Sequence, residues 1–283
     1  LEMIPNESGH AADFRIVETN PAWEQQTGLT DATGKTLLEI IPNIEQQWLD
    51  FYSDVVISGR GRRTEYYTAS VDRWYTVYAS RIGGEGSRQV AVVFNDITER
   101  KQREREQEFL LKLGDALRPL SDAVEIQRTA SRVIGEYLDV DRAYYCDIEP
   151  DDEHWVVADN YVREGVPPLI SRGRIDDFGW AGEQISAGRM LLISDVNTDP
   201  NLSESARREF RAVNVAAAVC IPLIKEGRWA ANFTLQYLRP HEWSEAEIKL
   251  AEETADRTWA AVERAKAEQR VRTSEDKYRS LFE

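Results

Sequence analysis

The sequence contains few of the residues from which metal centres and catalytic sites are usually built. Its 283 residues include 2 cysteines and 3 histidines. Cys146 and Cys220 lie far apart and lack the spacing of metal ligands. The sequence therefore predicts no metal site, and such sparing use of cysteine is typical of the reducing cytoplasm.

The sequence also lacks an excess of positive charge and a long apolar run. It carries 50 acidic against 35 basic residues, a net charge of -15. Such a charge repels phosphate backbones, so nucleic acid is excluded as a partner. The longest uncharged apolar run, at 213–224, is too short for a membrane span, which needs about 20 residues. No basic and apolar leader opens the sequence. We therefore expect a soluble, cytoplasmic protein without a membrane span.

Periodic patterns are present over most of the chain, and its length favours about two domains. In the first part, two short strands are followed by small helical turns, an amphipathic helix that ends at Gly59, and three strand-like runs. A long helix then begins after Ile97 and ends near Pro119. This pattern predicts an α+β domain with an antiparallel sheet.

The second part also alternates helical and strand patterns, but in a different order. A helix begins at Ser121 or Asp122, where Asp122 and Glu125 have the spacing of a capping box, and strands follow at 142–149 and 154–162. The runs "VAAAVCIPLI" and "RWAANFTLQYL" predict a central antiparallel hairpin. A last helix, capped by Ser244 and Glu247, continues with apolar residues three and four apart. Both parts therefore favour a central antiparallel sheet flanked by helices.

Two stretches resemble known sensory domains. The motifs "ETNPAWEQQTGLTDATGKTLLEIIP", "RWYTVYASRI" and "VAVVFNDITERK" resemble a PAS domain, and "RAYYCDI", "GRMLLISDV" and "CIPLIKEGRWAANFTLQYLRPHEWSEAEI" are similar to a GAF domain. The resemblance implies a PAS-like domain at 1–99, a connector helix at 100–118, a GAF-like domain at 119–268, and a signalling helix at 269–283 that leads into a further PAS-like domain. The connecting and final helices would be of coiled-coil type.

This resemblance implies a function in signal transduction. Chains built in this order most often belong to sensor histidine kinases of two-component systems, so we expect a sensory and relay module that passes a conformational change to a downstream kinase domain. We also expect a homodimer paired along the long helices. The alternatives are a structural dimerisation spacer without a ligand, and the sensory region of a cyclic-dinucleotide cyclase or phosphodiesterase.

Catalysis is not expected within this chain. His10, His154 and His241 do not lie on a helix of the kind that carries a phosphoacceptor histidine, and no ATP-binding motif is present. The triplet "DFG" at 177–179 lacks the other kinase motifs. The chain is therefore predicted not to be an enzyme, with the catalytic residues elsewhere in a longer protein.

The end of the last strand in the first part is the predicted relay site. Asp96 and Thr98 have short polar side chains that can bond the backbone where the strand becomes a helix. In the PAS family, the aspartate of an Asp-Ile-Thr triplet at the end of this strand is taken to connect the core to the outgoing helix. The resemblance assigns this role to Asp96, with Thr98 as a second connection.

Aromatic residues mark where a small-molecule ligand would bind, although aromatics at strand spacing are more often plain core. No covalent cofactor is expected: Cys220 has no histidine beside it for a bilin and is predicted to be a buried thiol, and His154 and His241 lie beside turns, which disfavours a haem. The candidate pocket residues are Trp48, Tyr66, Trp74, Tyr75 and Tyr78 in the first domain, and Phe178, Trp180, Cys220 and Trp229 in the second.

Overall fold

The computed structural model describes residues 1–149, 151, 153–225 and 227–279. The chain forms two compact units, Leu1–Arg105 and Glu106–Glu283. Both contain antiparallel sheets with helices, so the predicted mixture of helices and antiparallel strands is confirmed. No helix in the described part of the chain combines the length and apolar character needed to cross a membrane.

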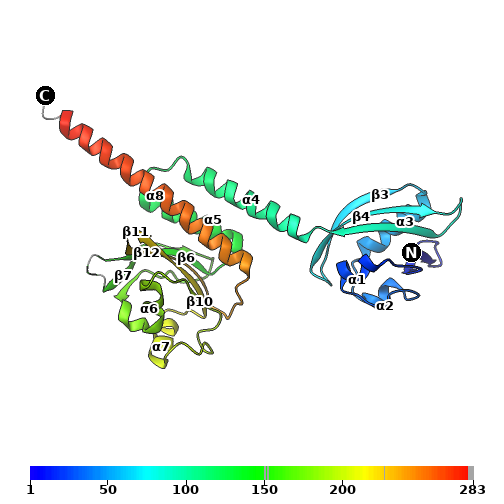
Figure 1. Ribbon diagram of the computed structural model, residues 1–283, viewed down its shortest axis with the longest axis horizontal. Coiled ribbons are helices and arrows are strands. Elements are labelled where there is room, and N and C mark those ends of the chain that lie inside the picture. The colour runs from blue at the N-terminus through cyan, green and yellow to red at the C-terminus, as the bar shows by residue number, and fades with distance from the viewer. Residues whose placement is uncertain (150, 152, 226, 280–283) are drawn as a thin grey trace. The chain divides into compact units, whose positions relative to one another are not determined.

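The first unit is built on a 5-stranded antiparallel sheet in the order β2-β1-β5-β4-β3 (Figure 1). Helix α3 ends at Gly59, whose left-handed backbone (φ 68°) terminates the helix as the sequence predicts. The elements are β1 (Glu2–Pro5), β2 (Ala11–Arg15), α1 (Pro21–Thr27), α2 (Leu37–Ile40), α3 (Gln46–Ser58), β3 (Arg62–Thr68), β4 (Arg73–Ile82) and β5 (Gln89–Asp96).

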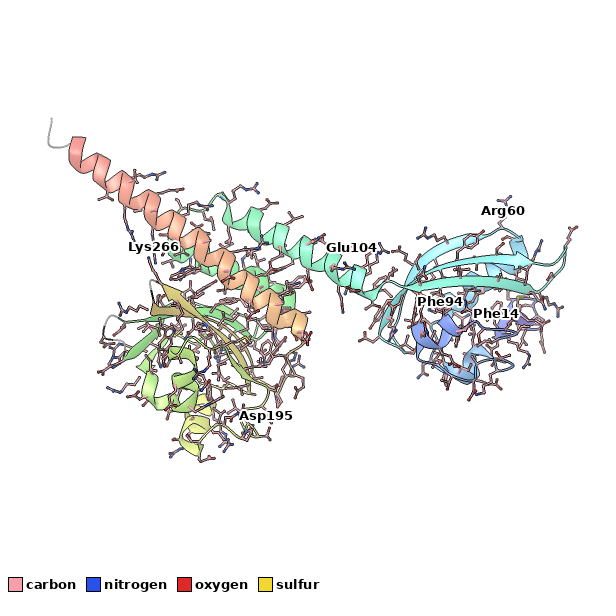
Figure 2. The ribbon with its side chains drawn as sticks, viewed as in Figure 1. Phe14, Arg60, Phe94, Glu104, Asp195 and Lys266 are labelled. Atoms are coloured by element: carbon pink, nitrogen blue, oxygen red, sulfur yellow. The ribbon has the colours of Figure 1, made fainter. Side chains whose placement is uncertain are left out.

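One face of this sheet carries the core of the first unit. Along β4, Tyr75, Val77 and Ala79 are buried, whereas Tyr78 is exposed. Successive side chains of a strand point to opposite faces, so this alternation places Tyr78 on the outer face. The buried residues pack against α3 and against Phe14, which is labelled in Figure 2.

The second unit has a 7-stranded sheet in the order β10-β11-β12-β6-β7-β9, with β8 paired to β6. The helix that begins at Thr98 contributes its later turns to this unit. The elements are α4 (Thr98–Leu117), α5 (Ala123–Leu138), β6 (Arg142–Ile148), β7 (His154–Val157), β8 (Tyr161–Val162), β9 (Ser171–Arg174), the 3-10 helix η1 (Ile175–Phe178), α6 (Trp180–Ser186), β10 (Leu191–Ile193), α7 (Glu204–Ala212), β11 (Ala217–Lys225), β12 (Arg228–Tyr237) and α8 (Glu245–Arg279).

Both faces of this second sheet are covered. Phe233 and Leu235 of β12 face a core formed with α4, α5 and α8, while Thr234 and Gln236 face the side of α6 and α7 (Figure 1). Ser244 and Glu247 form the predicted capping box at the start of α8, with hydrogen bonds of 2.8 Å and 3.3 Å. The helix predicted at 269–283 continues α8 as far as Arg279, and residues 280–283 lie outside the described residues.

Candidate functional site

Residues from four elements, α1, β4, β5 and α4, meet where β5 becomes α4. Asp96 Oδ1 accepts a hydrogen bond from the Thr98 N–H (2.9 Å), and Asp96 Oδ2 lies 2.9 Å from Arg73 Nη1. The Asp96 N–H donates to Oε1 of Gln26 on α1 (3.1 Å). We call Gln26, Arg73, Trp74, Asp96 and Thr98 the β5–α4 joint.

Thr98 has a different role from the helix cap. Its Oγ1 accepts a hydrogen bond from the Trp74 N–H (2.9 Å), while the Ile97 N–H donates to the Trp74 carbonyl oxygen (2.8 Å). Both backbone groups of Trp74 on β4 are therefore bonded to the start of α4. Asp96 supplies the capping bond, and Thr98 ties the helix to the neighbouring strand.

Electrostatics favour the charged form of Asp96. Burial by itself would raise the pKa of this carboxyl group, but hydrogen bonds from Thr98 and the charge of Arg73 outweigh it and leave the pKa below its ordinary value. Asp96 is thus an ionised acceptor at neutral pH, and bonds to a charged acceptor are stronger than bonds between neutral groups.

The first turns of α4 also rest on the outer face of the sheet. Lys101 Nζ and the Arg105 guanidinium lie 5.4 Å and 5.7 Å from the centre of the Trp74 ring. Arg100 and Lys101 both contact Glu65 of β3, at 2.8 Å and 2.9 Å, and their hydrogen bonds lower the pKa of Glu65. Glu104, labelled in Figure 2, bonds Arg100 from within the helix (2.9 Å).

The first unit contains a cavity of about 520 Å³ on the inner side of its sheet. Trp48 and Tyr75 line it, together with Trp23 of α1 and Phe94 of β5. The indole N–H of Trp23 is buried and has no partner among the described residues. The predicted places of Tyr66, Trp74 and Tyr78 in this lining are wrong. Strand alternation turns Trp74 and Tyr78 to the other face, and Tyr66 packs against the rings of Trp48 and Phe51 instead.

Helix α1 links this cavity to the joint. The carbonyl oxygen of Gln26 accepts hydrogen bonds from the Tyr75 hydroxyl (2.9 Å) and from Arg73 Nη1 (2.8 Å). Tyr75 lines the cavity, and so do Trp23 and Thr27 on the same helix as Gln26. A displacement of α1 would therefore act on Gln26 and Arg73, two of the three partners of Asp96.

The second unit contains a smaller cavity, of about 90 Å³, between the sheet and the side of α6 and α7. Of the residues that the sequence suggested for a pocket, Phe178, Cys220 and Trp229 line this cavity, and Trp180 packs nearby without lining it. The lining includes Cys146 and Gln236, which sequence patterns did not single out. Strand register brings these residues together, and a single sequence carries no signal of register between distant strands.

Both thiols of this cavity are buried and uncharged. Burial raises the pKa of the Cys220 thiol to about 11 and raises the pKa of Cys146 further. A thiol with a raised pKa is a weak nucleophile. The predicted burial of Cys220 on a central strand agrees with its 8% exposed surface.

The histidines of this unit lie away from both cavities. His154 Nδ1 bonds Asp151 (2.7 Å), and His241 Nε2 bonds Glu247 (2.9 Å) at the start of α8. Glu149, Asp151 and His154 have ligand atoms within 4.8 Å of one another. Arg172 bonds both oxygens of Glu149 and compensates its charge, so we assign no ion to this cluster.

Comparison with known proteins identifies the second unit. Residues 122–262 match the GAF domain family. No curated protein matches the chain. Among solved structures, the phycoerythrobilin-bound GAF domain of a cyanobacterial phytochrome has a TM-score of 0.50 at 15% identity, and the alignment covers 59% of this chain and 99% of that one.

Two further solved structures resemble part of the chain. A phycocyanobilin-bound GAF domain from a cyanobacterial phytochrome gives a TM-score of 0.49 at 17% identity, covering 59% of this chain and 96% of that one. The free methionine-R-sulfoxide reductase of Neisseria meningitidis, in complex with its substrate, gives 0.48 at 15% identity, covering 57% and 90%. Identities this low indicate the fold alone.

The phycoerythrobilin-bound structure corrects the prediction that no cofactor is bound. A GAF domain of similar fold holds a bilin, so the lack of a histidine beside Cys220 is not a reason to dismiss a cofactor. The cavity offers two thiols, the groups through which a bilin is linked. Its volume of 90 Å³ does not fit a tetrapyrrole, because pockets for large ligands measure about 300–1,000 Å³.

Proposed function

We propose that this chain, in which residues 122–262 form a GAF domain, is a sensory and signal-relay module of a larger receptor. In this proposal the first unit is a PAS-like sensor. Its 5-stranded sheet, its cavity and the contacts of Asp96 and Thr98 support this assignment. Catalysis belongs to a domain outside the chain.

The relay would run from the first cavity to α4. A ligand that touches Trp23 or Tyr75 changes the position of α1 or β4, and Gln26 and Arg73 carry that change to Asp96. Asp96 then alters the start of α4, the helix whose later residues Phe109 and Leu113 are buried in the core of the GAF domain. The two states of such a switch need differ by only a few kcal/mol.

The observation that carries this proposal is the set of bonds made by Asp96. One residue bonds the helix that lines the cavity, the strand beside it and the first turn of the outgoing helix. A linker without a signalling role needs only a cap at this position. Three separate partners are what a coupling element requires.

The experiment replaces Asp96 with Ala in the full-length receptor and measures melting temperature and output activity. A lost helix cap costs about 0.5–2 kcal/mol, a small part of the stability of a domain, which is about 5–15 kcal/mol. We therefore expect the fold to survive and the output to change strongly. Glu108→Ala is the control, because Glu108 is exposed on the same helix.

The proposal fails if Asp96→Ala melts close to wild type and its output is no more altered than that of Glu108→Ala. The joint would then be a plain linker. Amide hydrogen exchange over residues 97–117 supplies a second readout, since a released helix start exchanges faster.

We further propose a parallel homodimer in which the long helices pair, with a histidine kinase as output. The length of α8, which runs to Arg279, supports this arrangement. Light scattering at micromolar concentration should give about twice the chain mass of 32.4 kDa. A monomer over that range would contradict the dimer and leave the relay within one chain to be tested separately.

A structural spacer and the sensory region of a cyclic-dinucleotide enzyme are the other candidates. A spacer would fill its cavities with its own side chains, whereas the first unit contains a cavity of 520 Å³ bordered by an unpartnered indole N–H. The output domain is identified by the activity of the full-length receptor.

A further inference from the structure

Arg142 is a buried cation without an acidic partner. Its surface is 2% exposed, and it is the largest fully buried side chain among the described residues. Nε donates to the Pro167 carbonyl oxygen (3.0 Å) and Nη1 to that of Val213 (2.7 Å). No acidic group of the described residues lies within ion-pair distance of it. An isolated buried charge is costly, so a compensating anion would stabilise this site.

Arg142 lies directly behind the small cavity of the GAF domain. It is the cross-strand partner of Gln236, and on β6 it shares a face with Tyr144. Gln236, Tyr144 and Val213 all line the cavity. Arg142 does not itself line the cavity, but its Nη1 bonds the carbonyl oxygen of Val213, so its positive charge lies behind the Val213 and Gln236 end of the lining.

The same end of the cavity holds an incompletely bonded amide. Gln236 is 4% exposed, and its Nε2 lies 2.5 Å from the Tyr144 hydroxyl oxygen, while its Oε1 has no partner among the described residues. The two ends of an amide can exchange places, because a tyrosine hydroxyl either accepts or donates. With the amide turned, the Tyr144 hydroxyl donates to Oε1 and the NH₂ group is free to donate to a ligand.

No acidic side chain of the described residues lines the cavity, and burial keeps the thiols of Cys146 and Cys220 protonated by raising their pKa values. Asp141, the nearest carboxylate in sequence, bonds Arg163 and the Leu238 N–H. Its charge also acts on Arg142, but burial outweighs it and leaves the pKa of Arg142 below its ordinary value. The charge of Arg142 is therefore only partly compensated.

We propose that this cavity binds a small organic carboxylate, with its carboxylate group toward Arg142 and Gln236 and its short apolar chain toward the aromatic lining. The volume of 90 Å³ sets the size, because a cavity of about 150 Å³ holds benzene. A ligand of about five non-hydrogen atoms, such as propionate, fits this space. The inference rests on the proposed function only in treating the GAF domain as a sensor.

The experiment titrates the purified chain with propionate and follows its melting temperature and tryptophan fluorescence, to which Trp155 and Trp229 of the cavity contribute. Propionamide is the matched uncharged ligand, and sodium chloride at equal concentration is the salt control. We expect Tm to rise with propionate alone, since only a ligand of the folded state stabilises it. An equal rise with propionamide or chloride, or no rise at all, overturns the proposal.

Gln236→Glu tests, without any ligand, whether a negative charge beside Arg142 stabilises the fold. The new carboxylate would lie beside Arg142, so we expect an unchanged or higher Tm and no further response to propionate. A lower Tm with the response retained contradicts the proposal. Gln47→Glu, at an exposed position of the first unit, is the control for the added charge.

Gln236→Met removes the amide without adding charge. Loss of a hydrogen bond to a charged group should weaken propionate binding by about tenfold or more. Unchanged affinity overturns the proposed role of Gln236. A last measurement adds biliverdin to the purified chain. A coloured adduct that propionate does not displace would assign the cavity to a tetrapyrrole and overturn the proposal. Because none of these measurements uses the receptor output, they fail or succeed independently of the Asp96 relay.

Discussion

The first turns of α4, up to Arg105, are held by polar and charged contacts, whereas the turns after Glu106 are held by buried apolar side chains. Asp96, Thr98 and Glu65 bond the first part, and their side chains remain partly in contact with solvent. Phe109, Leu113 and Leu117 anchor the second part and are 2%, 0% and 4% exposed.

This difference indicates which part of the helix is adjustable. Hydrogen bonds and surface ion pairs each contribute about 1 kcal/mol, so they are broken and remade at small cost. Buried leucines in a close-packed core resist displacement. The start of α4 is therefore suited to respond to a signal and its end to deliver the response.

The largest expected effect is in the apolar part. Leu113→Ala should lower the free energy of unfolding of the GAF domain by about 2–5 kcal/mol, because it leaves a cavity in the core. Leu111→Ala is the control: Leu111 lies on the same helix and is 69% exposed, so its loss should matter little. Denaturant unfolding measures both, and equal losses would remove the distinction between the two parts.

A smaller effect is expected at the tie between α4 and β4. Thr98→Val keeps the shape of the side chain and removes the acceptor for the Trp74 N–H. We expect the first unit to lose about 0.5–1.5 kcal/mol, the usual contribution of one hydrogen bond. Thr98→Ser retains the hydroxyl and should stay close to wild type. Identical behaviour of the valine and serine variants would show that the bond contributes nothing.

The contribution of Asp96 should depend on pH. Its pKa in the folded state lies below the ordinary value of 3.8, so its stabilising effect is fully present above that value and is lost as pH falls through the lower folded value. The difference in unfolding free energy between wild type and Asp96→Asn should therefore be constant near neutral pH and shrink in acid below about pH 4. A difference that grows on acidification would contradict this sign.

The smallest effect is expected from the ion pairs of Arg100. Arg100→Ala removes contacts with Glu65 and Glu104, all of them partly exposed, and should lower the stability less than any other variant described here apart from the controls. The loss should disappear in about 1 M salt, where charges are screened within about 3 Å. Arg103→Ala is the control, because it removes only contacts with Glu99 of the same helix: a 3.6 Å ion pair and a 3.4 Å hydrogen bond to the Glu99 carbonyl oxygen.

Local sequence patterns predicted most of the fold. The stop of α3 at Gly59 and the caps at Asp122 and Ser244 depend on residues close in sequence, and each is found where predicted. The antiparallel type of both sheets was predicted from the strand patterns and the turns between them. Strand order and the exposure of Tyr78 were not predicted, because they depend on pairing between distant segments.

The candidate sites were predicted less completely. Asp96 and Thr98 were found because they sit beside the helix start that they serve. Gln26, whose bond to Asp96 spans 70 positions, gives no signal in its own neighbourhood. The aromatics of β4 were all assigned to the cavity, although alternate residues must face away from it. In the sequence, Arg142 looks like an ordinary strand residue. Only the structure shows that it is buried and forms no ion pair with a described residue, which makes it a candidate site residue.

The two bonds of Trp74 to the start of α4 have a kinetic consequence. The backbone N–H of Trp74 bonds Thr98 (2.9 Å) and its carbonyl group bonds Ile97 (2.8 Å). While one of these bonds is intact, it keeps the other group of Trp74 close to α4. If the two bonds break together, the helix start detaches in one event, with no gradual intermediate. A receptor built on this joint would give discrete responses from each molecule, and a graded response from a population would reflect the fraction of molecules that have switched.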